Sequence, residues 1–463
     1  MANYKTPGVF VEEISKLPPS IAQVETAIPA FVGFTEKAEK NGNTLVGKPT
    51  RIKSLAEYVE YFGMVDPADI TVNVTVSIDD DGSTKTIRKI VPQLDGGSTL
   101  YRMYHSLQLY FANGGGPCYI VSAQTTDNIT AIQTHLQDAV NALKYEDEPT
   151  LILIPDAHLA SNDTNYYTLF NSALVQSADL GDRFTIIDIA GSGVTTMRNA
   201  SLTNLKYGAT YYPDLKTMFN YIYDETQVHV TEIVNGTPEG AATPLSDIAG
   251  LQLGDFEYNA IKDAIQKELK VVLPPGSAMA GVYARVDNDR GVWKAPANVP
   301  VSAVIETMTK ISDEDQKSLN VDTTAGKSVN AIRFFTGKGI LVWGARTLAG
   351  NDNEWRYISV RRFYNMVEES VKKSSSWVVF EPNDANTWVK VKTMIENYLT
   401  TLWRQGALAG SAPEKAFFVK VGLGETMTSL DIMEGRMNIE IGMAAVRPAE
   451  FVILKFSHKM QEA

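Results

Sequence analysis

Leu151-Ile152-Leu153-Ile154 and Phe184-Thr185-Ile186-Ile187-Asp188-Ile189 are the stretches that decide the fold. Both are short, almost continuously apolar runs, and residues 118–122 form a third candidate strand. Continuous apolar strands that alternate with helices indicate an open sheet covered by helices on both faces. Helices are expected at 99–112, 129–144 and 165–177. The sequence therefore predicts a mixed α/β fold.

The flanking regions add elements on both sides of this pattern. A buried strand is expected at 27–35, a helix capped by Ser54 at 54–62, and polar β-hairpins at 70–91 and within 216–250. A domain boundary is expected near Pro274-Pro275-Gly276, followed by a second α/β unit. In that unit we expect strands at 340–343, 355–360, 377–380, 416–421, 437–442 and 450–456, and helices at 361–373 and 384–405.

Composition narrows the classes of function. The 463 residues include 44% hydrophobic and 21% charged residues, which is typical of a globular protein, and the net charge is −12. An acidic chain lacks the basic footprint of a nucleic-acid-binding protein and is repelled by anionic membranes. Cys118 is the only cysteine, so no intramolecular disulfide and no cysteine-based zinc site can form. The N-terminus has no apolar signal-peptide core, and we expect synthesis in a reducing cytoplasm.

Motifs typical of enzymes are incomplete. The stretch from Gly42 to Lys48 approaches a phosphate-binding loop, but Pro49 stands where a Ser or Thr would bind magnesium, which favours a simple turn between strands. Asp156 and Asp188 follow strands, as catalytic carboxylates often do, yet no base, nucleophile or metal cluster accompanies them, and loop capping is the better interpretation. The histidines also lack metal-ligand spacing. We assign no catalytic, cofactor-binding or metal-binding residue. A nucleotide-dependent enzyme built on residues 100–276 and a monomeric binding module remain as alternatives.

Blocks spread over most of the chain resemble contractile tail sheath proteins. The N-terminal block is Tyr4-Lys-Thr-Pro-Gly-Val-Phe-Val-Glu-Glu-Ile14, and two later ones are Val342-Trp-Gly-Ala-Arg-Thr-Leu348 and Pro448-Ala-Glu-Phe-Val452. The others, in the same order as in the family, are 18–21, 26–34, 109–121, 281–298, 330–333, 357–362, 377–383 and 406–410. The last blocks are most similar to the sheaths of phage-tail-like extracellular injection systems. The sheath of a true phage tail is the alternative within the family, and a type VI secretion sheath, usually split over two chains, fits less well.

The resemblance implies a structural protein that polymerises into a helical sheath and is not an enzyme. It implies an inner tube protein, baseplate proteins and terminal cap proteins as partners, with no cofactor, no nucleic acid and no membrane insertion. Contraction would drive the tube through a target envelope, and the assembled particle can act outside the cell. The expected domains are 1–35, an N-terminal arm and first strand; 36–276, an inserted outer α/β portion; and 277–463, which completes the assembly domain with a terminal strand.

Two sets of residues are candidates for contacts. Strand-forming residues near both ends can add to the sheet edge of a neighbouring subunit through main-chain hydrogen bonds: Val9, Phe10, Val11, Phe451, Val452, Ile453 and Leu454. The alternative is that both strands pair within their own chain. Charged residues of the helix at 361–373 are candidates for facing the tube: Arg361, Arg362, Lys372 and Lys373. On this helix, Glu368/Lys372 and Glu369/Lys373 are spaced for i,i+4 ion pairs.

Overall fold

The computed structural model describes residues 20–78, 85–95, 101–126, 130–191, 193–234, 236–248, 254–451 and 453. The chain divides into two compact units. The main unit contains residues 25–366 and the segment that begins at Arg447, and the smaller unit contains 367–446 with the described N-terminal residues up to Val24.

A nine-stranded sheet organises the main unit. Strand pairing within the described residues gives the order β15-β18-β17-β10-β9-β8-β1-β7-β4, and the interior pairs from β7 to β17 are parallel. Both ends of the sheet are antiparallel. The prediction of an α/β fold is therefore confirmed. The strands are β1 (Pro29–Thr35), β4 (Thr50–Ile52), β7 (Cys118–Thr125), β8 (Leu151–Leu153), β9 (Phe184–Ile187), β10 (Gly208–Tyr212), β15 (Val299–Pro300), β17 (Asn330–Phe335) and β18 (Gly339–Val342).

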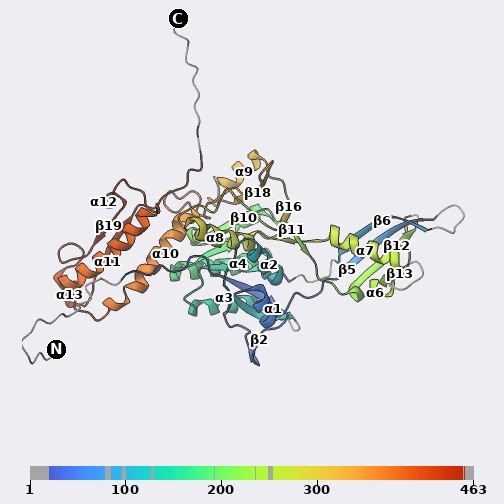
Figure 1. The fold of residues 1–463 in the computed structure, drawn as a ribbon, viewed down its shortest axis with the longest axis horizontal. Helices are drawn as coiled ribbons and strands as arrows, with labels where there is room; N and C mark the ends of the chain where they lie inside the picture. Colours follow the sequence, from blue (N-terminus) through green and yellow to red (C-terminus); the bar gives the residue numbers. More distant parts are fainter. Residues whose placement is uncertain are drawn as a thin grey trace, which may run out of the picture. The chain divides into compact units, whose positions relative to one another are not determined.

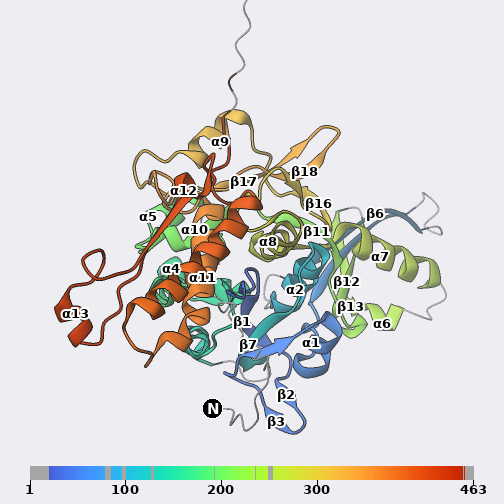
Figure 2. The same cartoon turned by 60° about the vertical axis from the view of Figure 1, so that its left-hand side comes forward.

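The two faces of this sheet carry separate hydrophobic clusters, because neighbouring residues of a strand point to opposite faces. Phe31 belongs to the cluster formed with α2 (Met103–Ala112) and α8 (Gly276–Arg290), whereas Ala30 and Val32 belong to the one formed with α3 (Ile132–Ala142) and α4 (Asp163–Leu180). Helices α2 and α8 lie side by side (Figure 2).

A glycine permits this close approach of α2 and α8. A Cβ atom at Gly281 would lie 2.4 Å from the carbonyl oxygen of Tyr110, so no other residue fits without moving the helices apart.

The domain boundaries expected from the sequence differ from this architecture. The expected inserted portion 36–276 supplies interior strands of the same sheet as 299–342, so it does not form a body of its own. Pro275 and Gly276 do not mark a linker, because they begin the buried helix α8. Proline is compatible with the start of a helix, because the backbone N–H groups of the first turn have no acceptor within the helix and the missing N–H of proline is not needed there.

The two polar hairpins are confirmed, and they combine into one sheet. Strand β5 (Ile70–Ile78) pairs with β6 (Lys85–Leu94), β12 (Val228–Val234) pairs with β13 (Thr237–Pro244), and β12 runs parallel to β5. Helices α6 (Leu245–Ile248) and α7 (Gly254–Glu268) contact this four-stranded sheet (Figure 1). Alternate residues of β5 and β12 form a hydrophobic cluster with Ile261 and Ile265 of α7. Two insertions distant in sequence therefore share one core.

The smaller unit contains most of the long C-terminal helices. Helix α10 (Ile358–Ser374) is divided between the two units. Helix α11 (Ala385–Arg404) is capped by Asp384 and lies along β19 (Phe417–Lys420) (Figure 1). Strand β20 (Glu440–Met443) pairs with β19 in a two-stranded antiparallel sheet. The predicted strands at 416–421 and 437–442 are thereby confirmed. Short helices α12 (Pro413–Ala416) and α13 (Ser429–Met433) complete this unit.

The strand expected at 355–360 is wrong. Ile358 and Val360 begin helix α10, and both are buried together with Phe363 and Val367 of the same helix. Apolar and polar residues alternate at 358–360, as in a strand, but the apolar residues up to position 367 recur at helical spacing.

The strand expected at 377–380 is also wrong. Ser376–Val378 forms a 3-10 turn, and Phe380 follows with a φ of 70° and a fully exposed side chain. A positive φ interrupts a strand, so the aromatic and β-branched composition of this stretch was misleading.

The remaining elements are short or peripheral. Helix α1 (Leu55–Phe62) has the predicted cap, in which the Glu57 N–H donates to the Ser54 hydroxyl. The others are β2 (Glu39–Lys40), β3 (Asn43–Thr44), β11 (Leu215–Asn220), β14 (Lys270–Leu273), β16 (Val304–Thr307), α5 (Val194–Asn199) and α9 (Asp313–Asn320).

Candidate functional site

The N-terminal boundary of the main unit is fixed by a buried polar cluster. The Thr26 hydroxyl donates to Asp287 Oδ2 at 2.6 Å, and Arg362 Nη2 donates to the Thr26 carbonyl at 2.7 Å. Arg362 also forms a two-pronged ion pair with Asp287, with N–O distances of 2.5 and 3.0 Å. Its guanidinium lies over the Tyr283 ring, 4.6 Å from the centroid. We call Thr26, Asp287 and Arg362 the N-terminal clamp.

The C-terminal segment is fixed in the same manner by Glu450. Arg346 donates from Nε and Nη2 to the two carboxylate oxygens at 2.9 and 2.6 Å, Asn320 Nδ2 donates at 2.8 Å, and the Tyr357 hydroxyl donates at 3.2 Å. Burial raises the pKa of Glu450, but hydrogen bonds from Arg346 and Asn320 outweigh it, and the pKa is lowered overall. Glu450 is therefore a carboxylate at neutral pH. We call Arg346, Glu450, Asn320 and Tyr357 the C-terminal clamp.

Charge-assisted, two-pronged hydrogen bonds of this kind are directional and strong. Removing one partner of a buried ion pair leaves an uncompensated charge and costs about 3–5 kcal/mol, whereas an apolar substitute for the whole pair is often as stable. The presence of the two clamps is therefore weak evidence for added stability.

The strand-forming residues proposed at the two ends lie mostly outside the described residues. This applies to Val9, Phe10, Val11, Val452 and Leu454.

Phe451 and Ile453 are described, with 71% and 79% of their surfaces exposed, and neither is in a strand of this single chain. Large apolar side chains this exposed, directly after a fixed carboxylate, are available for a partner.

A short sheet in the smaller unit offers strand edges. Strands β19 and β20 pair through Phe417↔Met443 to Lys420↔Glu440, and no third strand joins them within the described residues. An edge strand presents unpaired N–H and C=O groups that an added strand can bond.

Two of the four candidates for tube contact are buried. A side chain that contacts the tube has to be exposed. Arg361 and Arg362 are buried, the latter in the N-terminal clamp, so the prediction that they face the tube is wrong. Arg361 donates from Nε to Asn365 Oδ1 at 2.7 Å and stacks over Trp355, 4.2 Å from the ring centroid. Both guanidiniums lie over aromatic rings, an arrangement that suits the flat, delocalised charge of Arg better than the compact charge of Lys.

Lys372 and Lys373 are more accessible, at 69% and 39% of their side-chain surfaces. Both lie near the buried carboxylate of Glu369, at 3.2 and 3.4 Å. The predicted i,i+4 pair of Lys373 is confirmed, and Lys372 contacts Glu369 at i,i+3.

The carboxylates after β8 and β9 cap loops, as the sequence predicts. Asp156 accepts the backbone N–H groups of Phe34 and Arg102 at 2.8 and 2.7 Å, and Asp188 accepts that of Gly276 at 2.9 Å. Burial raises the pKa of Asp156 to about 6 and that of Asp188 to about 7.

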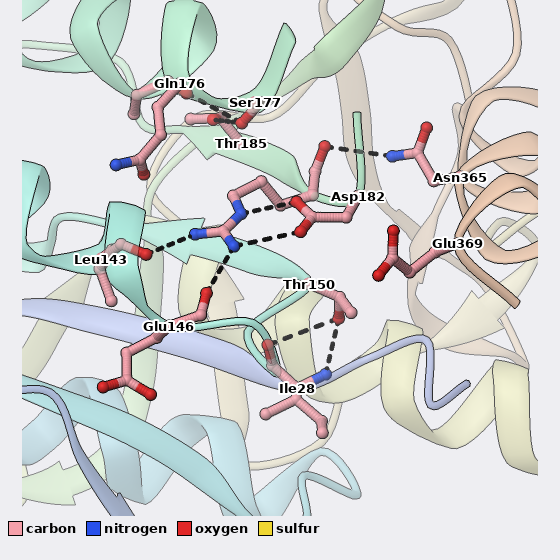
Figure 3. A network of polar contacts seen from close by, with 12 residues as sticks. Ile28, Leu143, Glu146, Thr150, Gln176, Ser177, Asp182, Thr185, Asn365 and Glu369 are labelled. Atoms are coloured by element: carbon pink, nitrogen blue, oxygen red, sulfur yellow. Dashed lines mark hydrogen bonds and ion pairs between the residues drawn. The ribbon is translucent and has the colours of Figure 1, made fainter. Parts of the chain in front are cut away.

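Another buried arginine, Arg183, connects the loop after α3 to the segment before β9. Arg183 donates to Asp182 Oδ1 at 2.7 Å and to the carbonyl oxygens of Leu143 and Glu146 at 2.8 and 2.7 Å (Figure 3). Asn365 Nδ2 donates in turn to the Arg183 carbonyl at 3.1 Å. The Asn365 contact joins the middle of α10 to the residue just before β9, so this cluster has a structural role.

Other features are consistent with these interpretations. Gly42 lies in the turn between β2 and β3 with a φ of 74°, so the incomplete phosphate loop is a turn between strands as predicted. Among the described residues, no three His, Cys, Asp or Glu side chains gather as metal ligands. No helix in the described part of the chain combines the length and apolar character needed to span a bilayer.

Sequence reasoning missed both clamps. Arg346 and Glu450 are 104 positions apart, and Arg362 and Asp287 are 75 positions apart. Local sequence patterns do not predict pairs at such separations. One signal was present: Arg346 and Glu450 lie in two of the quoted blocks, 342–348 and 448–452.

Comparisons with known proteins agree with these observations. Residues 350–459 match the family described as phage tail sheath C-terminal domain. The curated tail sheath protein of Enterobacteria phage T4 is 27% identical over 127 residues, which cover 27% of this chain and 19% of that protein. A putative prophage major tail sheath protein of Pseudomonas aeruginosa is 24% identical over 164 residues, 34% of this chain and 38% of that protein. The matched stretch thus spans less than two fifths of these curated relatives.

Solved structures match over nearly the whole chain. The anti-feeding prophage helical sheath in its contracted state is 32% identical, with a TM-score of 0.65, covering 98% of this chain and all of that one. The contracted sheath complex of the extracellular contractile injection system PVC is 30% identical, with a TM-score of 0.64 and 99% coverage of both chains. The fold and these matches define a structural subunit of a contractile sheath. The chain belongs to the contractile tail sheath protein family, and its relatives are named as structural components, not as enzymes.

Proposed function

We propose that this chain polymerises into a helical sheath around an inner tube and that contraction of the sheath drives the tube through a target envelope. The observation that carries the proposal is the match, from end to end, with a helical sheath in its contracted state. Baseplate and terminal cap proteins would bound the polymer, and a further match to a chain of the anti-feeding prophage baseplate supports the first of these. The full-length matches favour a particle that acts outside the cell over a true phage tail.

Subunits are joined, in this proposal, by strand exchange at the chain ends. Val9–Val11 and the strand expected after Glu450 add to the sheet edge of a neighbour. The exposed side chains of Phe451 and Ile453 and the two-stranded sheet β19–β20 support this idea. Main-chain hydrogen bonds give register with little dependence on side chains, so such links can persist while other faces slide.

The inner tube is contacted, in this proposal, by Lys372 and Lys373. Exposed charges contribute about 0–1 kcal/mol per contact. Such contacts are weak singly, but repeated at every subunit they could hold the tube and still separate together during contraction.

Electron microscopy of the purified protein tests polymerisation. We expect long hollow tubes from the full chain, and a soluble, folded subunit without tubes after deletion of residues 1–14. A full chain that stays monomeric under all conditions would contradict the proposal and favour the binding-module alternative. A subunit that unfolds on deletion would instead place the arm in its own chain.

A further inference from the structure

One buried arginine–carboxylate pair lies at the N-terminal start of the main unit, and another lies in its C-terminal segment. Thr26 is the second residue of this unit and is bound by Asp287 and Arg362, and Glu450 is bound by Arg346 three residues after the unit resumes at Arg447. The two clamps use different helices and loops, so the arrangement occurs twice independently.

The C-terminal clamp binds a single carboxylate through several hydrogen bonds. Glu450 accepts four hydrogen bonds from three side chains, two of them from the planar fork of Arg346. A fork that engages both carboxylate oxygens fixes the orientation of the bound residue as well as its position. Beyond it, the side chains of Phe451 and Ile453 are largely exposed. Among the described residues of this segment, Glu450 is thus the last whose side chain is fixed by hydrogen bonds.

We propose that the two clamps are positioning devices for strand exchange: they set the point and direction at which each end of the chain leaves the main unit. The proposal rests on the strand exchange proposed above. A one-residue slip in strand pairing turns every side chain to the other face, so an arm with an unfixed root would pair in several registers. The clamps would restrict the arm to one.

The C-terminal clamp gives the cleaner test, because Glu450 belongs to a terminal segment. Glu450→Gln keeps the shape of the side chain and removes its charge, and Tyr357→Phe removes only the 3.2 Å hydrogen bond. Arg447→Gln is the matched control, since Arg447 lies in the same segment and donates to the Asn353 carbonyl instead of to the clamp.

Arm geometry can be measured directly in the full-length subunit. Spin labels on Ile453→Cys and Tyr145→Cys, both exposed positions of the main unit, report the distance from arm root to body by pulsed electron paramagnetic resonance. The single native cysteine, Cys118, is buried and should not be labelled. Thermal unfolding and tube formation are followed in parallel.

We expect Glu450→Gln to widen the distance distribution. Because the variant leaves the buried Arg346 without its counter-charge, the melting temperature should also fall, so arm geometry and tube formation are compared at a temperature at which both proteins are folded. The critical concentration for tube formation should rise about tenfold, equivalent to ~1.4 kcal/mol per subunit added. Tyr357→Phe should show a smaller effect in the same direction, and Arg447→Gln none.

Three outcomes would overturn the positioning role: an unchanged distance distribution in Glu450→Gln, a widened distribution with normal assembly, or an equal effect of Arg447→Gln. Failure of strand exchange itself is recognised separately, by normal tubes from a subunit whose N-terminal arm cannot pair.

Discussion

Arg346 and Glu450 lie 104 positions apart and are joined by two hydrogen bonds of 2.9 and 2.6 Å, one to each carboxylate oxygen. The pair connects the loop after β18 with the last carboxylate before the exposed C-terminal residues. Arg362 and Asp287 repeat this relationship near the other end of the main unit. In a polymer linked through its chain ends, these are the places where the links meet the folded body.

Replacement of Arg183 should reveal how much a buried pair matters to the fold alone. Arg183 is buried, with 1% of its side chain exposed, and Arg183→Met leaves Asp182 and two carbonyl groups without their donor. We expect a loss of about 3–5 kcal/mol in the free energy of unfolding, measured by chemical denaturation. Arg51→Met is the control, because Arg51 pairs with Glu148 at 34% exposure and should cost at most about 1 kcal/mol. Equal losses in the two variants would show that burial does not set the cost of breaking these pairs.

Stability should fall as the pH rises toward neutrality. Burial raises the pKa of Asp188 to about 7. The negative charge of Asp214 also raises this pKa, whereas the hydrogen bond from the Gly276 N–H and the positive charge of Arg102 lower it. In the unfolded chain this carboxyl titrates near 3.8, so between the two values the native state binds a proton that the unfolded state has released. The free energy of unfolding therefore decreases with rising pH, by up to ~1.4 kcal/mol per pH unit.

Asp188→Asn should flatten this dependence while keeping an oxygen to accept the Gly276 N–H. The check is the free energy of unfolding at about pH 5 and about pH 7.5, with wild-type protein beside the variant. The wild-type difference should shrink in the variant, and an unchanged difference would show that Asp188 does not titrate in this range.

Charge reversal should separate tube binding from sheath assembly. Lys372→Glu with Lys373→Glu is expected to abolish co-sedimentation with purified inner tubes. Because both lysines pair with the buried carboxylate of Glu369, the melting temperature of the variant and its assembly into empty sheaths are measured first. Lys317→Glu, at an exposed lysine of α9 that pairs with Glu314, is the control and should bind tubes normally. Tube binding that survives the double reversal would remove these two lysines from the interface.

The central architecture was predictable because buried parallel strands have a distinctive composition. Leu151–Leu153 and Phe184–Ile187 are almost entirely apolar, as strands buried on both faces tend to be. The boundary at Pro274–Gly276 was misjudged because proline and glycine are read as breakers, although proline suits a helix start. Helix α8 also lacks an amphipathic pattern, since every residue from 276 to 283 is buried.

The candidate sites were only partly accessible to sequence reasoning. Exposure of Lys372 and Lys373 follows from their helical spacing, but Arg361 and Arg362 were misplaced because burial of an arginine depends on partners outside its own helix. Trp355 and Asp287 are those partners. No local pattern predicts such contacts, and only the fold reveals them.

Strand exchange is the central claim, and a pair of substitutions at Val11, outside the described residues, tests it most directly. Val11→Pro removes one strand N–H and blocks ladder pairing, whereas Val11→Thr keeps the main-chain donor. Both subunits should fold with the melting temperature of the wild type. Electron micrographs should then show tubes from Val11→Thr and none from Val11→Pro; normal tubes from Val11→Pro would contradict strand exchange.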